Sequence, residues 1–198
     1  LVGCDALAPE PSLGGGEPIF EVDHSPYLDL VERLPTSHEE RAKLRTLASA
    51  PGIDRDALVR ELASVAEERG YAFGLGSQRA MEREPDLGVT YRIRDVAPSV
   101  LLLGNMGVVQ TRDLSTERIA ALVDEVGADA LCVHMSPAME LIQAKGDSDF
   151  RGGLETFARL VAELPVPVVA KETGNGIGRS CARRLRQVGV LHADTSGA

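Results

Sequence analysis

An imidazole and a carboxylate stand six residues apart in this sequence, on either side of a proline. His134 precedes Pro137, and Glu140 follows it. If the proline opens a helix, both side chains can reach one ligand, where the carboxylate suits a hard cation such as Mg²⁺ and the imidazole suits a phosphate or a proton transfer. A histidine with a structural role is the alternative, and the spacing alone leaves both interpretations open.

A second polar group lies upstream and has the residue types that bind phosphate. Ser77, Gln78 and Arg79 bring a hydroxyl, an amide and a guanidinium directly after Gly76. A guanidinium matches phosphate bidentately, and glycine lets the backbone approach a ligand closely. The alternative is a surface arginine whose aliphatic part covers apolar neighbours.

A lysine and a glycine-rich stretch follow the apolar residues 166–170. Lys171 stands where a desolvated ammonium can neutralise an anion or a charged, reduced ring, with a solvated loop lysine as the alternative. The stretch from Gly174 to Arg179 does not match a dinucleotide fingerprint, because its third glycine comes one residue early for GxGxxG. We interpret it as a strand-to-helix turn, with an anion site at a helix N-terminus as the alternative.

The elements that must hold these residues alternate between apolar strands and amphipathic helices. Ser115 and Gly127 have the residue types of an N-cap and a helix stop, and they bound one of these helices. Strands are predicted at 71–73, 100–103, 130–133, 166–170 and 190–193, with helices near 38–50, 54–70, 115–127, 154–164 and 182–188. Strands that are apolar on both faces and alternate with helices indicate a parallel sheet covered by helices.

Polar residues follow nearly every predicted strand, namely Ser77, Asn105, His134, Lys171 and Ser196. An open sheet gathers ligand residues at its switch point, whereas a barrel brings the carboxyl end of every strand to one mouth. We therefore predict an α/β fold of the (β/α)₈ TIM-barrel type. A complete barrel takes about 250 residues, so the chain is expected to cover the barrel incompletely, with residues 1–53 forming an irregular N-terminal segment and partial first barrel elements.

Six strings in a fixed order resemble the type 2 isopentenyl-diphosphate delta-isomerases, which are FMN-dependent (β/α)₈-barrel enzymes. The strings are YAFGLGSQRAM at 71–81, GNMG at 104–107, DALCVH at 129–134, QAKGDSDF at 143–150, VVAKETGNGIG at 168–178 and DTSGA at 194–198. One such string would be weak, but six in sequence are specific. The chain thus resembles a divergent member of that family over about residues 55–198.

The resemblance implies an isomerase that converts isopentenyl diphosphate to dimethylallyl diphosphate by adding and removing a proton, without net redox change. It implies FMN, Mg²⁺ and NADPH as flavin reductant, and it makes residues 54–198 part of a single FMN-binding TIM-barrel domain. The implied cofactor-binding residues are Ser77, Asn105, Lys171, Thr195 and Ser196; the substrate-binding residues are Arg79, Gln78 and His134; the metal ligand is Glu140; and the catalytic residues are His134, Ser136 and Lys171.

Two positions depart from the family's pattern. Ser136 stands where the family has Asn, and Met139 stands where it has Gln. A thioether cannot donate a hydrogen bond, so three functions stay open. They are the isomerisation, another reaction of a prenyl diphosphate such as cyclisation through an allylic cation, and an inactive paralogue that binds flavin or diphosphate.

The composition limits the partners. The 198 residues carry 21 Lys+Arg against 30 Asp+Glu, a net charge of −9 without a basic block, which argues against binding to a nucleic-acid backbone. No apolar run approaches the roughly 20 residues that a membrane helix requires. Three cysteines without CxxC spacing fit neither a disulfide framework nor a zinc site. We expect a cytoplasmic homo-oligomer that binds a small prenyl diphosphate and neither nucleic acid nor a membrane.

Overall fold

The chain folds as an α/β structure on one parallel sheet. The computed structural model describes residue 42 and residues 55–142, 146 and 149–195. Five strands lie in chain order, β1-β2-β3-β4-β5, and each neighbouring pair is parallel. The strands are β1 (Phe73–Gly74), β2 (Leu102–Gly107), β3 (Ala130–His134), β4 (Val168–Lys171) and β5 (His192–Asp194).

The prediction of a (β/α)₈ TIM barrel is wrong for the part of the chain that the structure describes. There the sheet has five strands, and β1 and β5 are its outer strands, each paired on one side only. A closed barrel has eight strands, and every strand is paired on both sides. The error has a physical reason. Alternating strands and helices with polar strand ends are common to all parallel α/β sheets, and this pattern does not determine whether the sheet closes into a barrel. The predicted boundary between residues 1–53 and 54–198 lies outside the described residues.

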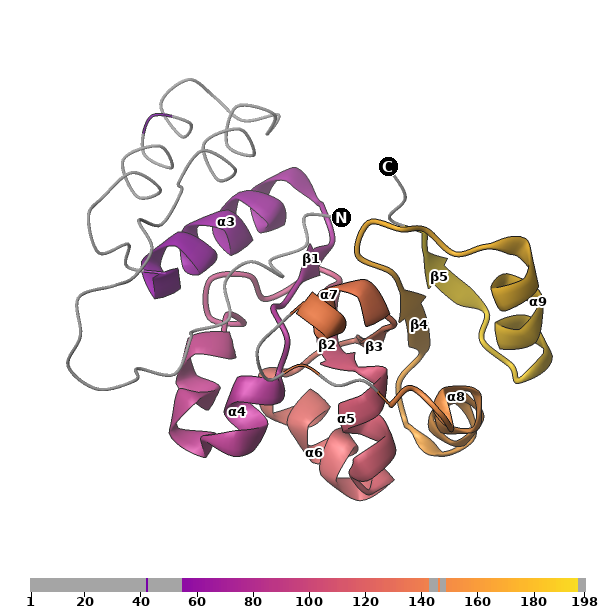
Figure 1. Ribbon diagram of the computed structural model, residues 1–198. Helices are drawn as coiled ribbons and strands as arrows, with labels where there is room; N and C mark the ends of the chain where they lie inside the picture. Colours follow the sequence, from indigo (N-terminus) through magenta and orange to yellow (C-terminus); the bar gives the residue numbers. More distant parts are fainter. Residues whose placement is uncertain (1–41, 43–54, 143–145, 147–148, 196–198) are drawn as a thin grey trace.

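Helices connect the strands and surround the sheet (Figure 1). Helix α3 lies near the β1 end of the sheet, α9 lies beside β5 at the opposite end, and α8 packs against α5, α6, α9 and β4. None of the described helices is both long enough and apolar enough to cross a membrane. The helices are α3 (Arg55–Arg69), α4 (Arg79–Arg83), the 3₁₀ helix η1 (Pro85–Tyr91), α5 (Val108–Asp113), α6 (Thr116–Val126), α7 (Pro137–Ile142), α8 (Gly153–Glu163) and α9 (Arg179–Gln187).

Helix α6 shows how local sequence sets an element. The Ser115 side chain accepts a hydrogen bond from the Arg118 N–H at the N-terminus, and Gly127 ends the helix in the left-handed conformation with φ of +66°. Both features confirm the predicted cap and stop. The apolar residues at helical spacing between them face the core and are buried, so sequence pattern, capping and packing agree here.

Strand β2 differs from its prediction. The sequence places the strand at 100–103 with a glycine-rich turn after it, but the strand runs from Leu102 to Gly107 and all six of its residues are buried. Asn105 pairs with Cys132 of β3, and Gly107 pairs with His134. Glycine and asparagine have low strand propensity, and here pairing with β3 overrides that preference.

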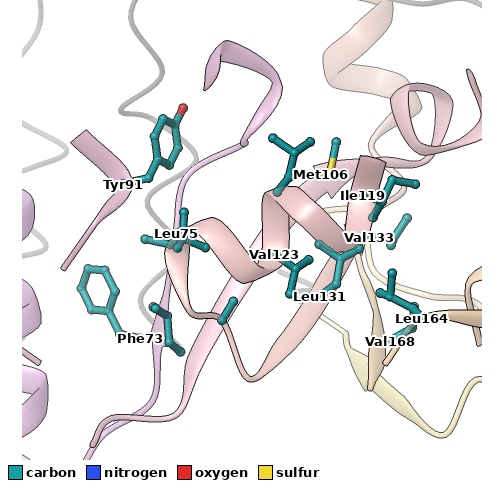
Figure 2. Close-up of a cluster of buried hydrophobic side chains, with 14 of the residues drawn as sticks. Phe73, Leu75, Tyr91, Met106, Ile119, Val123, Leu131, Val133, Leu164 and Val168 are labelled. Carbon is teal, nitrogen blue, oxygen red and sulfur yellow. The ribbon is translucent and has the colours of Figure 1, made fainter. Parts of the chain in front are cut away.

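The hydrophobic core fills the space between the sheet and its helices (Figure 2). Leu131 and Val133 of β3 contribute apolar side chains from the sheet, and Ile119 and Val123 of α6 meet them. Each fully buried side chain of this kind contributes about 1.5–3 kcal/mol relative to exposure. The core therefore fixes the strands and, with them, the residues at the strand ends.

Charged side chains tie together the amino edge of the sheet, where the chain enters β2 and β3. Arg94 donates to the carbonyl of Gly127 at 2.7 and 2.9 Å, to the carbonyl of Val100 at 2.8 Å and to Asp129 at 2.8 Å. Burial acts to raise the pKa of Asp129, but hydrogen bonds from the Leu102 N–H and from Arg94 outweigh it and lower that pKa. This edge is thus held by hydrogen bonds between side chains and backbone.

Candidate functional site at the carboxyl edge of the sheet

The carboxyl ends of the parallel strands bring the predicted site residues to one edge. The pairing aligns Gly107 with His134, His134 with Lys171, and Lys171 with Asp194 in a single row across four strands. His134 and Lys171, both predicted as catalytic, are therefore direct neighbours across β3 and β4. This proximity follows from the parallel register of β3 and β4.

His134 is oriented by Asn105. The imidazole Nδ1 lies 3.0 Å from the Asn105 amide oxygen, which can only accept a hydrogen bond, so Nδ1 carries the proton. The other ring nitrogen, Nε2, lies on the side of Gly107, where an added Cβ would come within 3.0 Å of it. In the neutral ring Nε2 then carries the lone pair.

Asn105 itself is used within the protein. Its amide nitrogen donates to the carbonyl of Leu75 at 3.2 Å while its oxygen faces His134, and the residue is 2% exposed. The side chain therefore joins the ends of β1, β2 and β3. Its predicted contact with a cofactor stays a prediction, and the structure adds a role in orienting His134.

Gln78 lies in the core. The residue is fully buried, its amide nitrogen donates to the carbonyl of Leu122 in α6 at 2.9 Å, and its amide oxygen accepts from the N–H of Asn105 at 3.1 Å. A Cβ on Gly104 would come within 2.7 Å of that oxygen, so Gly104 provides the space for the amide. Both ends of the Gln78 amide are bound within the chain, and its predicted contact with substrate stays a prediction.

Arg79 and Glu140 form an ion pair at the same edge. The Nη1 atom of Arg79 lies 3.6 Å from Oε2 of Glu140. Both side chains are largely buried, with 21% of the Arg79 side chain and 9% of the Glu140 side chain exposed. The predicted phosphate-binding cation and the predicted metal ligand are therefore neighbours, although 61 positions separate them in the sequence.

A cavity of about 180 Å³ lies beside Arg79, and Met106, Gln110 and residues of α4 and α5 complete its lining. Typical ligand pockets measure about 300–1,000 Å³, so this cavity is smaller than a typical ligand pocket. Sequence reasoning missed Gln110. The feature of the sequence that relates to Gln110 is the glycine at position 107, because a Cβ there would collide with the Gln110 amide oxygen.

The hydroxyl residues lie in different surroundings. Ser77 is half-buried, and its side-chain oxygen accepts weakly from the Arg79 N–H at 3.4 Å. Ser136 is buried at the start of α7, and Thr195 is exposed after β5. Ser196 lies outside the described residues, and so does the side chain of Met139.

Two further residues support this edge and were missed from the sequence. The hydroxyl of Tyr91 donates to the carbonyl of Ser77 at 2.8 Å, and burial raises the pKa of Tyr91 to about 12. Glu172, directly after Lys171, is buried and accepts hydrogen bonds from the loop that follows it. Tyr91 gave no signal in the sequence, whereas Glu172 stands beside a glycine-rich loop whose N–H groups favour an anion.

The fold and site together define an α/β protein with a polar site at the carboxyl edge of a parallel sheet. The chain is 46% identical over 138 residues to an isopentenyl-diphosphate delta-isomerase of Synechococcus sp., a match that covers 69% of this chain and 40% of the relative. Proteins of the same name from Thermococcus kodakarensis and Stutzerimonas stutzeri are 43% identical over 141 residues and 42% over 161, covering 69% and 80% of this chain and 38% and 46% of the relatives. The chain thus spans less than half the length of these relatives. No protein-family model matches it.

These comparisons correct the identification made from the sequence. The expectation was a divergent member of the type 2, FMN-dependent family, but the relatives carry only the name isopentenyl-diphosphate delta-isomerase, with no type and no flavin. The supported statement is coarser: the chain is similar to isopentenyl-diphosphate delta-isomerases.

Proposed function

We propose that the chain belongs to an enzyme that isomerises isopentenyl diphosphate to dimethylallyl diphosphate. The observation that carries the proposal is identity of 42–46% to isopentenyl-diphosphate delta-isomerases over 138–161 residues. The reaction moves a C=C bond: one proton is added to the terminal alkene carbon, and another is removed from the carbon on the far side of the double bond. The enzyme must therefore hold a diphosphate and manage a proton.

Arg79 and Glu140 are suited to the diphosphate. A guanidinium matches phosphate oxygens bidentately, and Mg²⁺ is commonly bound by one or two carboxylates together with substrate phosphates. Among the described residues no group of three or more His, Cys, Asp or Glu could hold a metal ion. Glu140 would hold Mg²⁺ through its carboxylate, and the ion would supply positive charge that neutralises the diphosphate.

His134, Ser136 and Lys171 are the proposed proton-handling residues. With Nδ1 held by Asn105 at 3.0 Å, Nε2 of His134 is the proposed proton acceptor, and the protonated ring would donate to a phosphate oxygen. Lys171 lies buried in the next strand, where its ammonium acts strongly on a nearby negative charge. The pairing of His134 with Lys171 across β3 and β4 supports this proposal, because it makes the two residues neighbours at the carboxyl edge.

We also propose dependence on FMN with a reductant such as NADPH. Lys171 fits a negatively charged reduced flavin, because it places a buried cation at a strand end, and Ser77 offers a half-buried hydroxyl after β1. Bound reduced FMN would supply negative charge that stabilises positive charge developing on the alkene. The further proposed properties are a homo-oligomer in the cytoplasm and no nucleic-acid or membrane partner.

The test is product analysis with the purified protein, isopentenyl diphosphate, Mg²⁺, FMN and NADPH. Dimethylallyl diphosphate is the expected product, and omitting FMN or Mg²⁺ should stop its formation. Glu140→Gln should remove the Mg²⁺-dependent turnover. Glu155→Gln, at an exposed position of α8, is the matched control and should leave turnover unchanged. A complete assay without dimethylallyl diphosphate would refute the proposed function.

A further inference from the structure

Glu172 is a buried carboxylate that the proposed reaction does not use. It follows Lys171 directly at the end of β4 and is 4% exposed. One oxygen of its side chain, Oε2, accepts three backbone hydrogen bonds, from the N–H groups of Gly174 at 3.0 Å, Asn175 at 2.6 Å and Gly176 at 3.1 Å. A buried charge with this many donors is strongly fixed in place.

The loop is shaped to receive this anion. Gly174 and Gly176 have positive φ values of +151° and +78°, a region that L side chains rarely adopt, and successive N–H groups in such a turn converge into an anion-binding nest. The sequence left a plain turn and an anion site as alternatives for this loop. The structure combines them, because the bound anion is the chain's own carboxylate.

The same residue is connected to the site lysine through its backbone. The Nζ atom of Lys171 donates to the carbonyl of Glu172 at 3.3 Å, and the N–H of Glu172 donates to the carbonyl of Asp194 in β5 at 3.2 Å. Strands β4 and β5 lie side by side in Figure 1. The carbonyl that accepts from Lys171 thus belongs to a residue held both by β5 and by its own loop.

We propose that Glu172 is a positioning residue: its carboxylate, clamped by the 174–176 loop, fixes the backbone carbonyl that orients the Lys171 ammonium at the carboxyl edge of the sheet. For its effect on turnover the inference rests on the proposed function. Removing the carboxylate frees the loop and the carbonyl, and the ammonium loses its fixed position. A displacement of 1 Å at a reacting centre lowers rates on the order of 100-fold.

Two variants and a control test this in the purified full chain. Glu172→Ala removes the acceptor and should lower kcat about 100-fold with little change in KM for isopentenyl diphosphate, because Lys171 is not the residue proposed to hold the diphosphate. Glu172→Gln keeps the size and one acceptor oxygen but loses the charge, which makes its hydrogen bonds about half as strong, so its kcat should lie between those of the wild type and Glu172→Ala. The exposed control Glu155→Gln should match the wild type.

Two further measurements on these variants do not depend on catalytic activity. Amide hydrogen exchange at residues 174–176 and the rate of chemical acetylation of Lys171, both followed by mass spectrometry, should rise in Glu172→Ala and be partly restored in Glu172→Gln. A folded Glu172→Ala protein with wild-type kcat, or with wild-type labelling of Lys171, would overturn the proposal. If Glu172→Ala does not fold, the same measurements on Glu172→Gln test the proposal, and wild-type values for that variant would overturn it. If the wild type lacks isomerase activity, the proposed function fails, while exchange and labelling still decide whether Glu172 positions Lys171.

Discussion

Replacing Gln78 by alanine separates two roles for this residue. The sequence points to a contact with substrate, whereas the structure buries the amide between β2 and α6, where it bonds to the N–H of Asn105 and the carbonyl of Leu122. A structural role predicts loss of stability. A role limited to substrate binding predicts a higher KM and unchanged stability.

The expected loss can be worked out from these contacts. Alanine at position 78 leaves the buried Asn105 N–H without its acceptor, which costs about 1–3 kcal/mol. Losing the bond to the carbonyl of Leu122 in α6 adds about 1 kcal/mol, and the removed methylene contributes about 0.8 kcal/mol. Together these changes lower the free energy of unfolding by about 3–5 kcal/mol. For a chain of this size, that corresponds to a fall in Tm of about 10 °C.

Urea unfolding followed by circular dichroism, with thermal scans in parallel, measures this loss. Gln187→Ala, at an exposed position near the end of α9, is the matched control and should change stability by less than about 0.5 kcal/mol. A Gln78→Ala protein as stable as the control would refute the structural role. A raised KM in that case would restore the contact with substrate.

Three further predictions concern neighbouring positions. Asn105→Ala should release the His134 ring and lower stability by about 2 kcal/mol; imidazole ¹⁵N NMR that still shows a fixed Nδ1–H tautomer would contradict this. Gly107→Ala should displace Gln110 and lower turnover more than stability, because the new Cβ would collide with the Gln110 amide oxygen; unchanged kcat would count against it. Burial raises the pKa of Tyr91 to about 12, above about 10 in an unfolded chain, so its contribution to stability is fully present below pH 10 and is lost as the pH rises towards 12. Tyr91→Phe should show a smaller decline in urea unfolding between pH 9 and 11.5, and identical declines would exclude this residue as the cause.

Local sequence predicted the elements whose signals are self-contained. Helix α6 begins after Ser115 and ends at Gly127 because a cap and a stop act within one turn of the chain. The adjacency of His134 and Lys171 was predictable too, because consecutive parallel strands place their carboxyl ends at one edge. Closure of the sheet was not predictable, since it depends on which strands pair and not on the residue types at the strand ends.

The interior contacts of the site could not be read from the sequence. Gln78 and Arg79 are adjacent in the chain, yet one is fully buried in the core and the other pairs with Glu140 at the site. The two side chains lie in different surroundings because of the path that the backbone takes after β1. The contacts of Glu172 also depend on the backbone path, because its carboxylate reaches the N–H groups of its own loop only when Gly174 and Gly176 take positive φ values.

The amino edge and the carboxyl edge of the sheet differ in how their residues contribute to folding. Arg94 and Asp129 at the amino edge hold backbone groups, so replacing them disturbs the entry of several elements at once. At the carboxyl edge, His134 and Lys171 end their strands, whereas Ser77 and Ser136 stand on the loops that follow, which the core-fixed strands carry. Ser136, which departs from the pattern that the sequence resembles, lies at this second edge. Loop positions such as Ser136 can therefore change at a smaller cost to folding than Arg94 and Asp129, whereas the buried amides of Gln78 and Asn105 hold the backbone at the carboxyl edge as well.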